Sequence, residues 1–468
     1  MNAQTSRNRW LWLAPLALAF ALLGVLLVLL PAQAQGTVRY VAKGGSDSGA
    51  CSNSGSPCLT IAYAIAQASA GDTIQIGAGT YGENLTVDRA LTFIGAGADA
   101  TFVDGGGTGR VFTATNFSSL ALSSLTVQNG NDSIAGGLYV PDGGLSLNQV
   151  NVLSNTAVSS GGAAYVNVSA VITGGRFQNN ACTGAGCGGG ALYVYGPLLI
   201  TGTQVISNSA TGAGGGVYAD DSVSLAAAQF ISNTAGSSGG GVNAAGIDAD
   251  VTAAGSVFQG NVCTDADCIG GGLNAVDRLI VSGTRFVNNR ADYGGALAQS
   301  GDGTGEIVNT LFARNTANVN GAAAYLASSE PVTILFTTIA SPTVGATAAI
   351  SIEQGTLNVT NTIFSNYLAS IDAAGETAAN SDYNLFYNAP TAVVIGGNSI
   401  TGTNPLFVDP VADNYRLQST SPAADAGVDL GVNTDLDGVA RPQGAGFSMG
   451  AYEIAYAEPG CFATLDDT

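Results

Sequence analysis

Short apolar runs recur along the chain at a regular interval, and the same polar residue follows most of them. A large apolar residue, usually phenylalanine, is followed three positions later by asparagine. These asparagines are Asn155, Asn180, Asn208, Asn233, Asn261, Asn289 and Asn315, and Asn366 follows Ile363 two periods further on. A polar loop, two or three glycines and a strand such as GGGALYV come next. A period of about 26 residues is typical of a solenoid.

The pattern within each period favours strands over helices. Each copy contains β-type runs of about three to six residues and no helical spacing. About 26 residues form one coil of three short strands and three turns, which stacks about 4.8 Å from the next by parallel pairing. We therefore predict an all-β fold, a single-stranded right-handed parallel β-helix of about twelve coils over residues 75–400. The phenylalanines would stack inside it. The asparagines would adopt left-handed turns and hydrogen-bond along the axis.

The segment before the repeats, residues 35–74, predicts an N-terminal cap. In CLTIAYAIAQASAGD, Ile61, Ile65 and Ala68 share one helical face, and Gly71 is a stop signal. A capping helix here would cover strand edges that otherwise promote aggregation.

The first residues predict export. Arg7 and Arg9 precede an apolar run and an A-x-A site at residues 32–34, as in a secretory signal peptide covering residues 1–34. An uncleaved membrane anchor is the alternative, because about 20 apolar residues can span a bilayer. Export would place the protein outside the cell, secreted or at the cell surface, where its cysteines can oxidise.

The composition of the chain restricts its binding partners and its catalytic chemistry. Acidic residues outnumber basic ones 33 to 13, which gives a net charge of −20. Such a surface repels phosphate backbones, so we expect no nucleic-acid partner. The chain contains no histidine, which excludes histidine-based acid–base catalysis and histidine metal ligands.

The spacing of the cysteines predicts local disulfides rather than a metal site. Two pairs lie in expanded loops three coils apart, about 14 Å along the axis, too far to share one tetrahedral ion. We expect each pair to form a disulfide worth about 2 kcal/mol, and a third to form before the cap helix. The pairs are Cys182 with Cys187, Cys263 with Cys268, and Cys51 with Cys58, which leaves Cys461 unpaired.

The F-x-x-N and GG-[AGV] repeats resemble those of polymorphic outer membrane proteins, within the pectin-lyase-like superfamily. The segment from NPLFVDP to MGAYE (residues 404–453) resembles the choice-of-anchor Q domain, to which we assign residues 401–456, followed by a tail, 457–468. The resemblance implies a secreted or surface-displayed β-helix tethered by a C-terminal anchor. No apolar helix or sorting motif follows Glu453, so free secretion and a longer protein both stay open. Any membrane contact would depend on the signal peptide or on such an anchor.

One column of the repeat suggests a binding surface. Strand alternation places a tyrosine on the outside of four consecutive coils and asparagine on the next two. These residues are Tyr139, Tyr165, Tyr193, Tyr218, Asn243 and Asn274. Exposed rings and amides suit the C–H and hydroxyl groups of a polysaccharide or a cell-surface glycan. Alternatively, the rings only stabilise the sheet surface.

Catalytic and metal sites are less well supported. Asp142, Asp221 and Asp277 fall in one turn column, and the last two lie about 10 Å apart, at the limit for an inverting glycosidase pair. Turn formation also explains them. Asp435 and Asp437 have spacing that Ca²⁺ sites use, which makes Ca²⁺ the only cofactor suggested, with a plain turn as the alternative.

We therefore expect a non-enzymatic β-helix that presents a long surface for adhesion or polysaccharide binding. A polysaccharide lyase or glycoside hydrolase, pectate lyase-like or polygalacturonase-like with a divergent carboxylate site, is one alternative. A structural component of the cell envelope is another.

Overall fold

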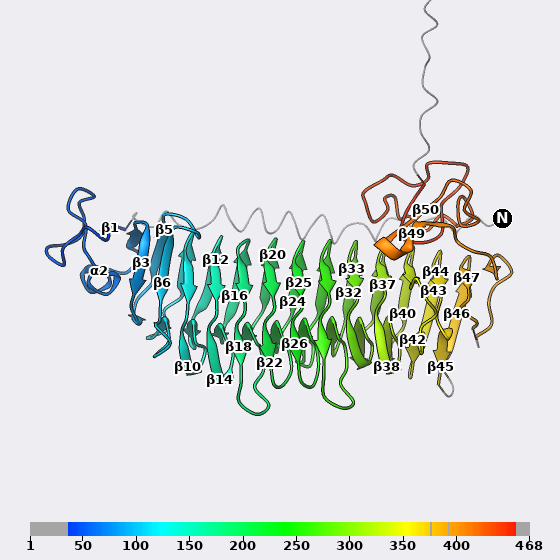
Figure 1. Ribbon diagram of the computed structural model, residues 1–468, viewed down its shortest axis with the longest axis horizontal. Helices are drawn as coiled ribbons and strands as arrows, with labels where there is room; N and C mark the ends of the chain where they lie inside the picture. The colour runs from blue at the N-terminus through cyan, green and yellow to red at the C-terminus, as the bar shows by residue number, and fades with distance from the viewer. Residues whose placement is uncertain (1–35, 375–376, 392, 455–468) are drawn as a thin grey trace, which may run out of the picture.

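The chain winds into a parallel β-solenoid of about twelve turns (Figure 1). The computed structural model describes residues 36–374, 377–391 and 393–454. The predicted signal peptide, the tail at 457–468 and Cys461 lie outside these ranges. No helix within the described ranges is long and apolar enough to cross a membrane.

Four parallel sheets, A to D, form the sides of the solenoid. Sheet A has 14 strands from β1 (Val38–Val41) to β46 (Ala378–Asp382), and sheet B has 14 from β3 (Gly79–Gly82) to β48 (Ile400–Thr401). Sheet C has 12, from β4 (Leu85–Val87) to β45 (Ala369–Ala373). Sheet D has 8, from β10 (Asn131–Ile134) to β38 (Thr316–Asn320).

The prediction of three strands per coil is wrong wherever sheet D is present. A full turn contains strands of sheets D, C, A and B, such as β10, β11 (Leu138–Val140), β12 (Gly144–Asn148) and β13 (Asn151–Leu153). The extra strand forms in the polar loop after the asparagine and is as short as the two residues of β22 (Ser209–Ala210). Each strand pairs in parallel with its equivalent one turn away, so the turns stack in register.

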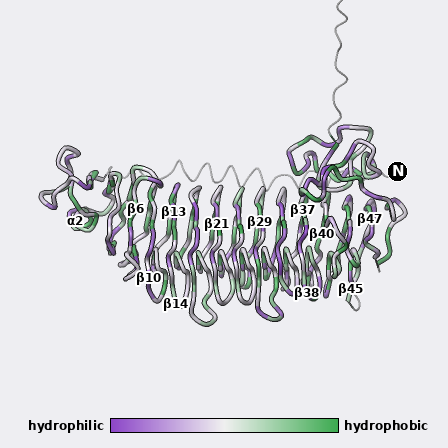
Figure 2. The backbone as a smooth tube through the Cα atoms, in the orientation of Figure 1, coloured by the Kyte–Doolittle hydropathy of each residue, from purple (hydrophilic) through white to green (hydrophobic). Residues whose placement is uncertain are grey.

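Apolar side chains alternate along the strands and fill the inside of the coil. Figure 2 shows hydrophobic and hydrophilic residues interspersed along the tube. The predicted phenylalanine column is confirmed, since Phe230, Phe258, Phe286 and Phe312 are fully buried. Their ring centres lie 4.8–5.0 Å apart with interplanar angles of 7–9°. This spacing equals the distance between paired strands, so rings one turn apart pack face to face.

The asparagine column forms a buried hydrogen-bonded ladder. The Oδ1 atom of Asn208 accepts hydrogen bonds from both the backbone N–H and the Nδ2 of Asn180, at 3.0 and 2.9 Å. Asn208 Nδ2 in turn donates to Asn233 Oδ1 and to the carbonyl of Phe177. The pattern repeats from Asn155 to Asn315, so these buried amides are all paired along the axis.

Two details of this column differ from the prediction. The left-handed residue is the one before each ladder asparagine, such as Ser207 at φ 52° or Ser232 at φ 55°. Asn366 is such a turn residue, at φ 62°, because the core position of its coil is Phe364, one residue after Ile363. Tyr367 therefore occupies the ladder position of that coil, and the continuous ladder ends at Asn315.

The glycine runs make the sharp turn between sheets D and C. Gly189 has φ 69°, a conformation that side chains other than glycine rarely adopt. A Cβ atom on Gly190 would lie 2.1 Å from the carbonyl oxygen of Gly215 in the next turn. Glycine is therefore required at both positions, for backbone angle at one and for close approach at the other.

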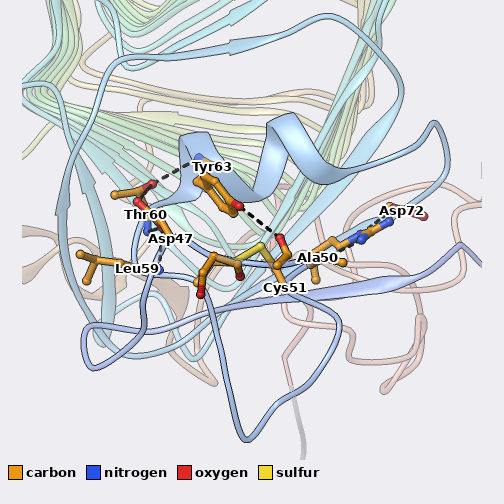
Figure 3. Close-up of a disulfide and its surroundings, with 11 residues drawn as sticks. Asp47, Ala50, Cys51, Leu59, Thr60, Tyr63 and Asp72 are labelled. Atoms are coloured by element: carbon orange, nitrogen blue, oxygen red, sulfur yellow. Dashed lines mark hydrogen bonds and ion pairs between the residues drawn. A yellow bond between two sulfur atoms is a disulfide. The ribbon is translucent and has the colours of Figure 1, made fainter.

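A short helix lies at the N-terminal end of the solenoid, within the range predicted to be a cap (Figure 1). Helix α2 (Ile61–Gln67) buries Ile61, Ala64 and Ile65, and Thr60 caps it by accepting from the N–H of Tyr63. Its function as a cap stays a prediction. The disulfide between Cys51 and Cys58 holds the preceding loop beside Tyr63 (Figure 3).

In each of the other two disulfides, the first cysteine lies in an interior column of small residues in sheet D. Cys182 is aligned with Ala157 in the turn before it and Ala210 in the turn after it. It is bonded to Cys187, and Cys263 is bonded to Cys268, with Cα atoms 5.5 and 5.9 Å apart. All four cysteines are buried, so each bridge fixes the base of a loop that projects beyond sheet D (Figure 1).

The C-terminal segment packs on the outside of sheet B. Its hairpin, β49 (Phe407–Asp409) and β50 (Asn414–Leu417), and residues up to Ile454 cover the last turns of the solenoid (Figure 1). Tyr415, Met449 and Ala451 pack against outward-facing Leu311, Ile363 and Leu385. A fully buried ion pair between Arg441 and Glu453, at 3.2 Å, holds the segment together. Residues 401–454 are thus integral to the fold.

We predict that Asn233→Ala lowers the free energy of unfolding by about 3 kcal/mol. The change removes the acceptor for Asn208 N–H and Nδ2, and each unsatisfied buried donor costs about 1–3 kcal/mol. Urea denaturation followed by circular dichroism measures the difference. The matched control is Asn148→Ala, at an exposed strand position, and an equally small effect of both substitutions would contradict a stabilising ladder.

Candidate functional site

Four tyrosines lie on the outer face of sheet C, in four consecutive turns. Tyr139, Tyr165, Tyr193 and Tyr218 occupy the middle of β11, β15 (Ala164–Val166), β19 (Leu192–Val194) and β23 (Val217–Ala219). The strands align them directly. Both neighbours of each tyrosine in its strand are buried and the tyrosine itself is partly exposed. With Tyr195, described next, these residues form the tyrosine strip.

Tyr195 joins this row and is its most exposed ring. Its side chain is 42% exposed, and its ring centre lies 5.1 Å from that of Tyr193 and 5.8 Å from that of Tyr165. The sequence interpretation missed it. The signal was present, because residues two apart in a strand share a face, and Tyr193 and Tyr195 are two apart.

The stacking of the rings limits which of their atoms a ligand can contact. The centres of Tyr193 and Tyr218 lie 4.5 Å apart at an interplanar angle of 22°, and Tyr165 stacks on Tyr193 at 5.7 Å. The faces of the inner rings are thus covered by their neighbours. The row presents ring edges and hydroxyl groups, while Tyr195 lies edge-on to Tyr165 at 70° and supplies the exposed aromatic surface.

Charged groups lie at both ends of the strip. At one end the guanidinium of Arg110 lies 4.3 Å from the ring centre of Tyr139. It pairs with Asp132 at 3.3 Å and donates to the carbonyl of Ile134. At the other end, the hydroxyl of Tyr193 donates to Asp220 at 3.4 Å. The arginine is thus engaged within the protein, and the carboxylate is an acceptor beside the strip.

The hydroxyls of Tyr165, Tyr193 and Tyr218 have raised pKa values. Burial raises the pKa of Tyr165 to about 12, and the nearby Tyr195 adds to this effect. Burial and a hydrogen bond with Tyr195 raise the pKa of Tyr193 above its ordinary value. Burial, then the charge of Asp220, raises the pKa of Tyr218. These three hydroxyl groups therefore stay uncharged at neutral pH and can donate or accept hydrogen bonds.

The two asparagines expected to extend the strip do not face solvent. Asn243 and Asn274 follow the tyrosines in register on sheet C but are only 2% and 3% exposed. Asn243 Oδ1 accepts from Ser238 Oγ and from Asn274 Nδ2, at 2.9 and 2.8 Å. The turn from sheet D closes over them in these coils, so the exposed strip ends at Tyr218.

The three candidate catalytic aspartates lie in different surroundings, and a catalytic function for them stays a prediction. Asp221 lies two turns from Asp277, and Asp221 Oδ1 accepts from the N–H of Ser222, as in a turn. Asp142 is exposed. The chain at Gly303 closes over Asp277, since a Cβ there would lie 2.1 Å from its Oδ1. Within the described ranges no hydrogen bond joins Asp221 to Asp277.

Asp435 and Asp437 stabilise the C-terminal segment. Asp435 accepts hydrogen bonds from the N–H groups of Asp437, Val439 and Glu453, at 2.8 Å each. Asp437 pairs with Arg285 and Arg416, at 2.6 and 2.5 Å. These contacts use the oxygen atoms that a cation would need. No cluster of three or more potential metal ligands occurs in the part of the chain that the structure describes.

Comparison with known proteins gives matches among solved structures. No family model and no curated protein matches the chain. The pectate lyase Pel9A is similar over 90% of this chain and 97% of its own, with 14% identity and a TM-score of 0.39. The pectin methylesterase PemA from Erwinia chrysanthemi is similar over 78% of this chain and 92% of its own, with 14% identity and a TM-score of 0.22. Similarities this distant carry no argument about activity. The resemblance to polymorphic outer membrane protein repeats and choice-of-anchor Q stays a prediction.

We expect Tyr165 to make the fold sensitive to alkali. Its pKa is about 12 in the fold and about 10 in the unfolded chain. Between these values only the unfolded chain releases the proton, so stability falls as pH rises from about 10 to about 12. Urea midpoints over this range, for the parent protein and Tyr165→Phe, measure the effect. The variant should lose less stability, and identical losses would disprove this assignment.

Proposed function

We propose that the protein binds an uncharged polysaccharide along the tyrosine strip. The observation that carries this proposal is the exposed ring of Tyr195 above four tyrosines stacked in register. An aromatic face packs against the C–H groups of a sugar ring, and hydroxyl groups beside it exchange hydrogen bonds with the sugar hydroxyls.

The residues around Tyr195 suit the same ligand. In the turns before and after it, the equivalent positions are Asn167, which is exposed, and Asp220, which is partly exposed. An amide, an aromatic ring and a carboxylate thus lie side by side on neighbouring strands. Each can form hydrogen bonds or ring contacts with a sugar, and none requires a charge on the ligand.

The charge of the protein favours an uncharged polymer over a polyuronide. The net charge is −20, and Arg110, the cation in contact with the strip, already pairs with Asp132. A polyanion would meet long-range repulsion without a free cation at the strip to offset it. We also propose that the protein works outside the cell, because its three disulfides suit an oxidising compartment.

We predict that Tyr195→Ala weakens binding to uncharged polysaccharides by about tenfold or more, the loss of one well-placed aromatic contact. The assay is affinity electrophoresis in gels containing soluble β-glucan, xylan or galactomannan, with polygalacturonate as the acidic comparison. The matched control is Tyr325→Ala. Tyr325 faces outward from sheet C four strands beyond Tyr218 and contacts Tyr293 rather than the strip.

Retardation of the parent protein and Tyr325→Ala, but not of Tyr195→Ala, would support the proposal. Absence of retardation in every uncharged gel, or equal retardation of all three proteins, would reject it. Release of new reducing ends from any of the polymers would favour the alternative of a polysaccharide-degrading enzyme.

A further inference from the structure

A groove of about 600 Å³ lies between the C-terminal segment and the last turns of the solenoid. One wall is formed where β41 (Thr338–Ala340), β44 (Ile363–Ser365) and β47 (Leu385–Tyr387) end side by side. The other wall is the chain around β49, from Asn404 to Gln418. Sheet D ends at β38, so the turns that line the groove have no strand of sheet D after their strand of sheet B. The volume falls within the range of small-molecule sites, about 300–1,000 Å³.

Two amides of the groove come from the turns that follow the last strands of sheet B. Asn366 and Asn388 occupy left-handed turn positions, at φ 62° and 45°, after the core residues Phe364 and Phe386. Asn388 Nδ2 donates to Asn366 Oδ1 at 3.1 Å, and Asn366 Nδ2 donates to the carbonyl of Ser341 at 2.7 Å. The ladder of the earlier turns lies inside the coil, whereas this shorter chain of amides lines an open groove.

Three amides of the groove, unlike Asn366, are held by one polar atom and have the other free. Gln418 Nε2 donates to the carbonyl of Phe407 at 2.9 Å, and Asn404 Oδ1 accepts from the N–H of Leu406 at 2.8 Å. Among the described residues, Gln418 Oε1, Asn404 Nδ2 and Asn388 Oδ1 have no hydrogen-bonding partner. Two acceptors and one donor are therefore oriented by these hydrogen bonds. Binding a ligand to them costs the protein little side-chain entropy.

The groove carries no charge, although the protein is strongly acidic. All its lining residues are uncharged, against a net charge of −20 for the chain. Ring surface comes from Tyr387 and Phe407. Acceptors, donors and ring surface without charge match a molecule rich in hydroxyl groups that is itself uncharged. We propose that this groove is a second binding site, for a short uncharged oligosaccharide, and that it is independent of the tyrosine strip.

Isothermal titration calorimetry tests the site with three probes: the β-1,4-linked tetrasaccharides of glucose, xylose and mannose. Asn388→Asp places a negative charge beside the free acceptors and keeps a residue that tolerates the left-handed turn. Tyr387→Phe removes only a hydroxyl group. We expect at least one tetrasaccharide to bind, and each substitution to weaken that binding about tenfold.

Two controls separate the groove from other effects. Asn179→Asp makes the same chemical change at an exposed left-handed residue, φ 56°, elsewhere on the solenoid, and it should leave binding unchanged. Tyr195→Ala should leave in place the tetrasaccharide binding that Asn388→Asp weakens, even if it abolishes binding at the strip, so the two sites can fail separately. The proposal is overturned if no tetrasaccharide binds. It is equally overturned if both groove variants bind as the parent does, or if Asn179→Asp weakens binding as much as Asn388→Asp.

Discussion

The ladder of buried asparagines is the interaction on which the other parts of this solenoid depend. Each Oδ1 from Asn180 to Asn315 accepts hydrogen bonds from two donors of the preceding turn. The Nδ2 groups of Asn180, Asn208 and Asn261 also donate to a carbonyl of the preceding turn. A buried amide would cost several kcal/mol if unpaired, so the ladder fixes both the register and the spacing of the turns. The phenylalanine stack, the glycine turns and the outward tyrosines follow from that register.

Both proposed binding surfaces arise from this repetition and from its interruption. Where the repeat is regular, one outward position per turn becomes a straight row, and the tyrosines of sheet C form such a row. Where it fails, after Asn315, sheet D stops and amides at the turn positions of the later coils line the groove beside the C-terminal segment. Regular turns thus supply an extended surface, and irregular turns supply a concave one.

The sequence predicts the features that depend on a neighbour one turn away. The period, the inward Phe230 column and the Asn233 ladder repeat often enough to be recognised. Sheet D was missed because its shortest strands have two residues and the composition of a loop. The burial of Asn243 depends on a turn from sheet D, and the groove depends on docking of residues far along the chain. No local pattern encodes either of these contacts.

The ladder also has a direction, which bears on how the chain assembles. Backbone and side-chain donors of each asparagine point to the asparagine of the following turn. A chain synthesised from its N-terminus therefore completes the hydrogen bonds of one turn only when the next turn has been added. At every stage a single growing end carries the unpaired donors, while all earlier turns are already satisfied. Such a chain can fold turn by turn as it is made, and the unpaired asparagine donors are always those of the most recent turn.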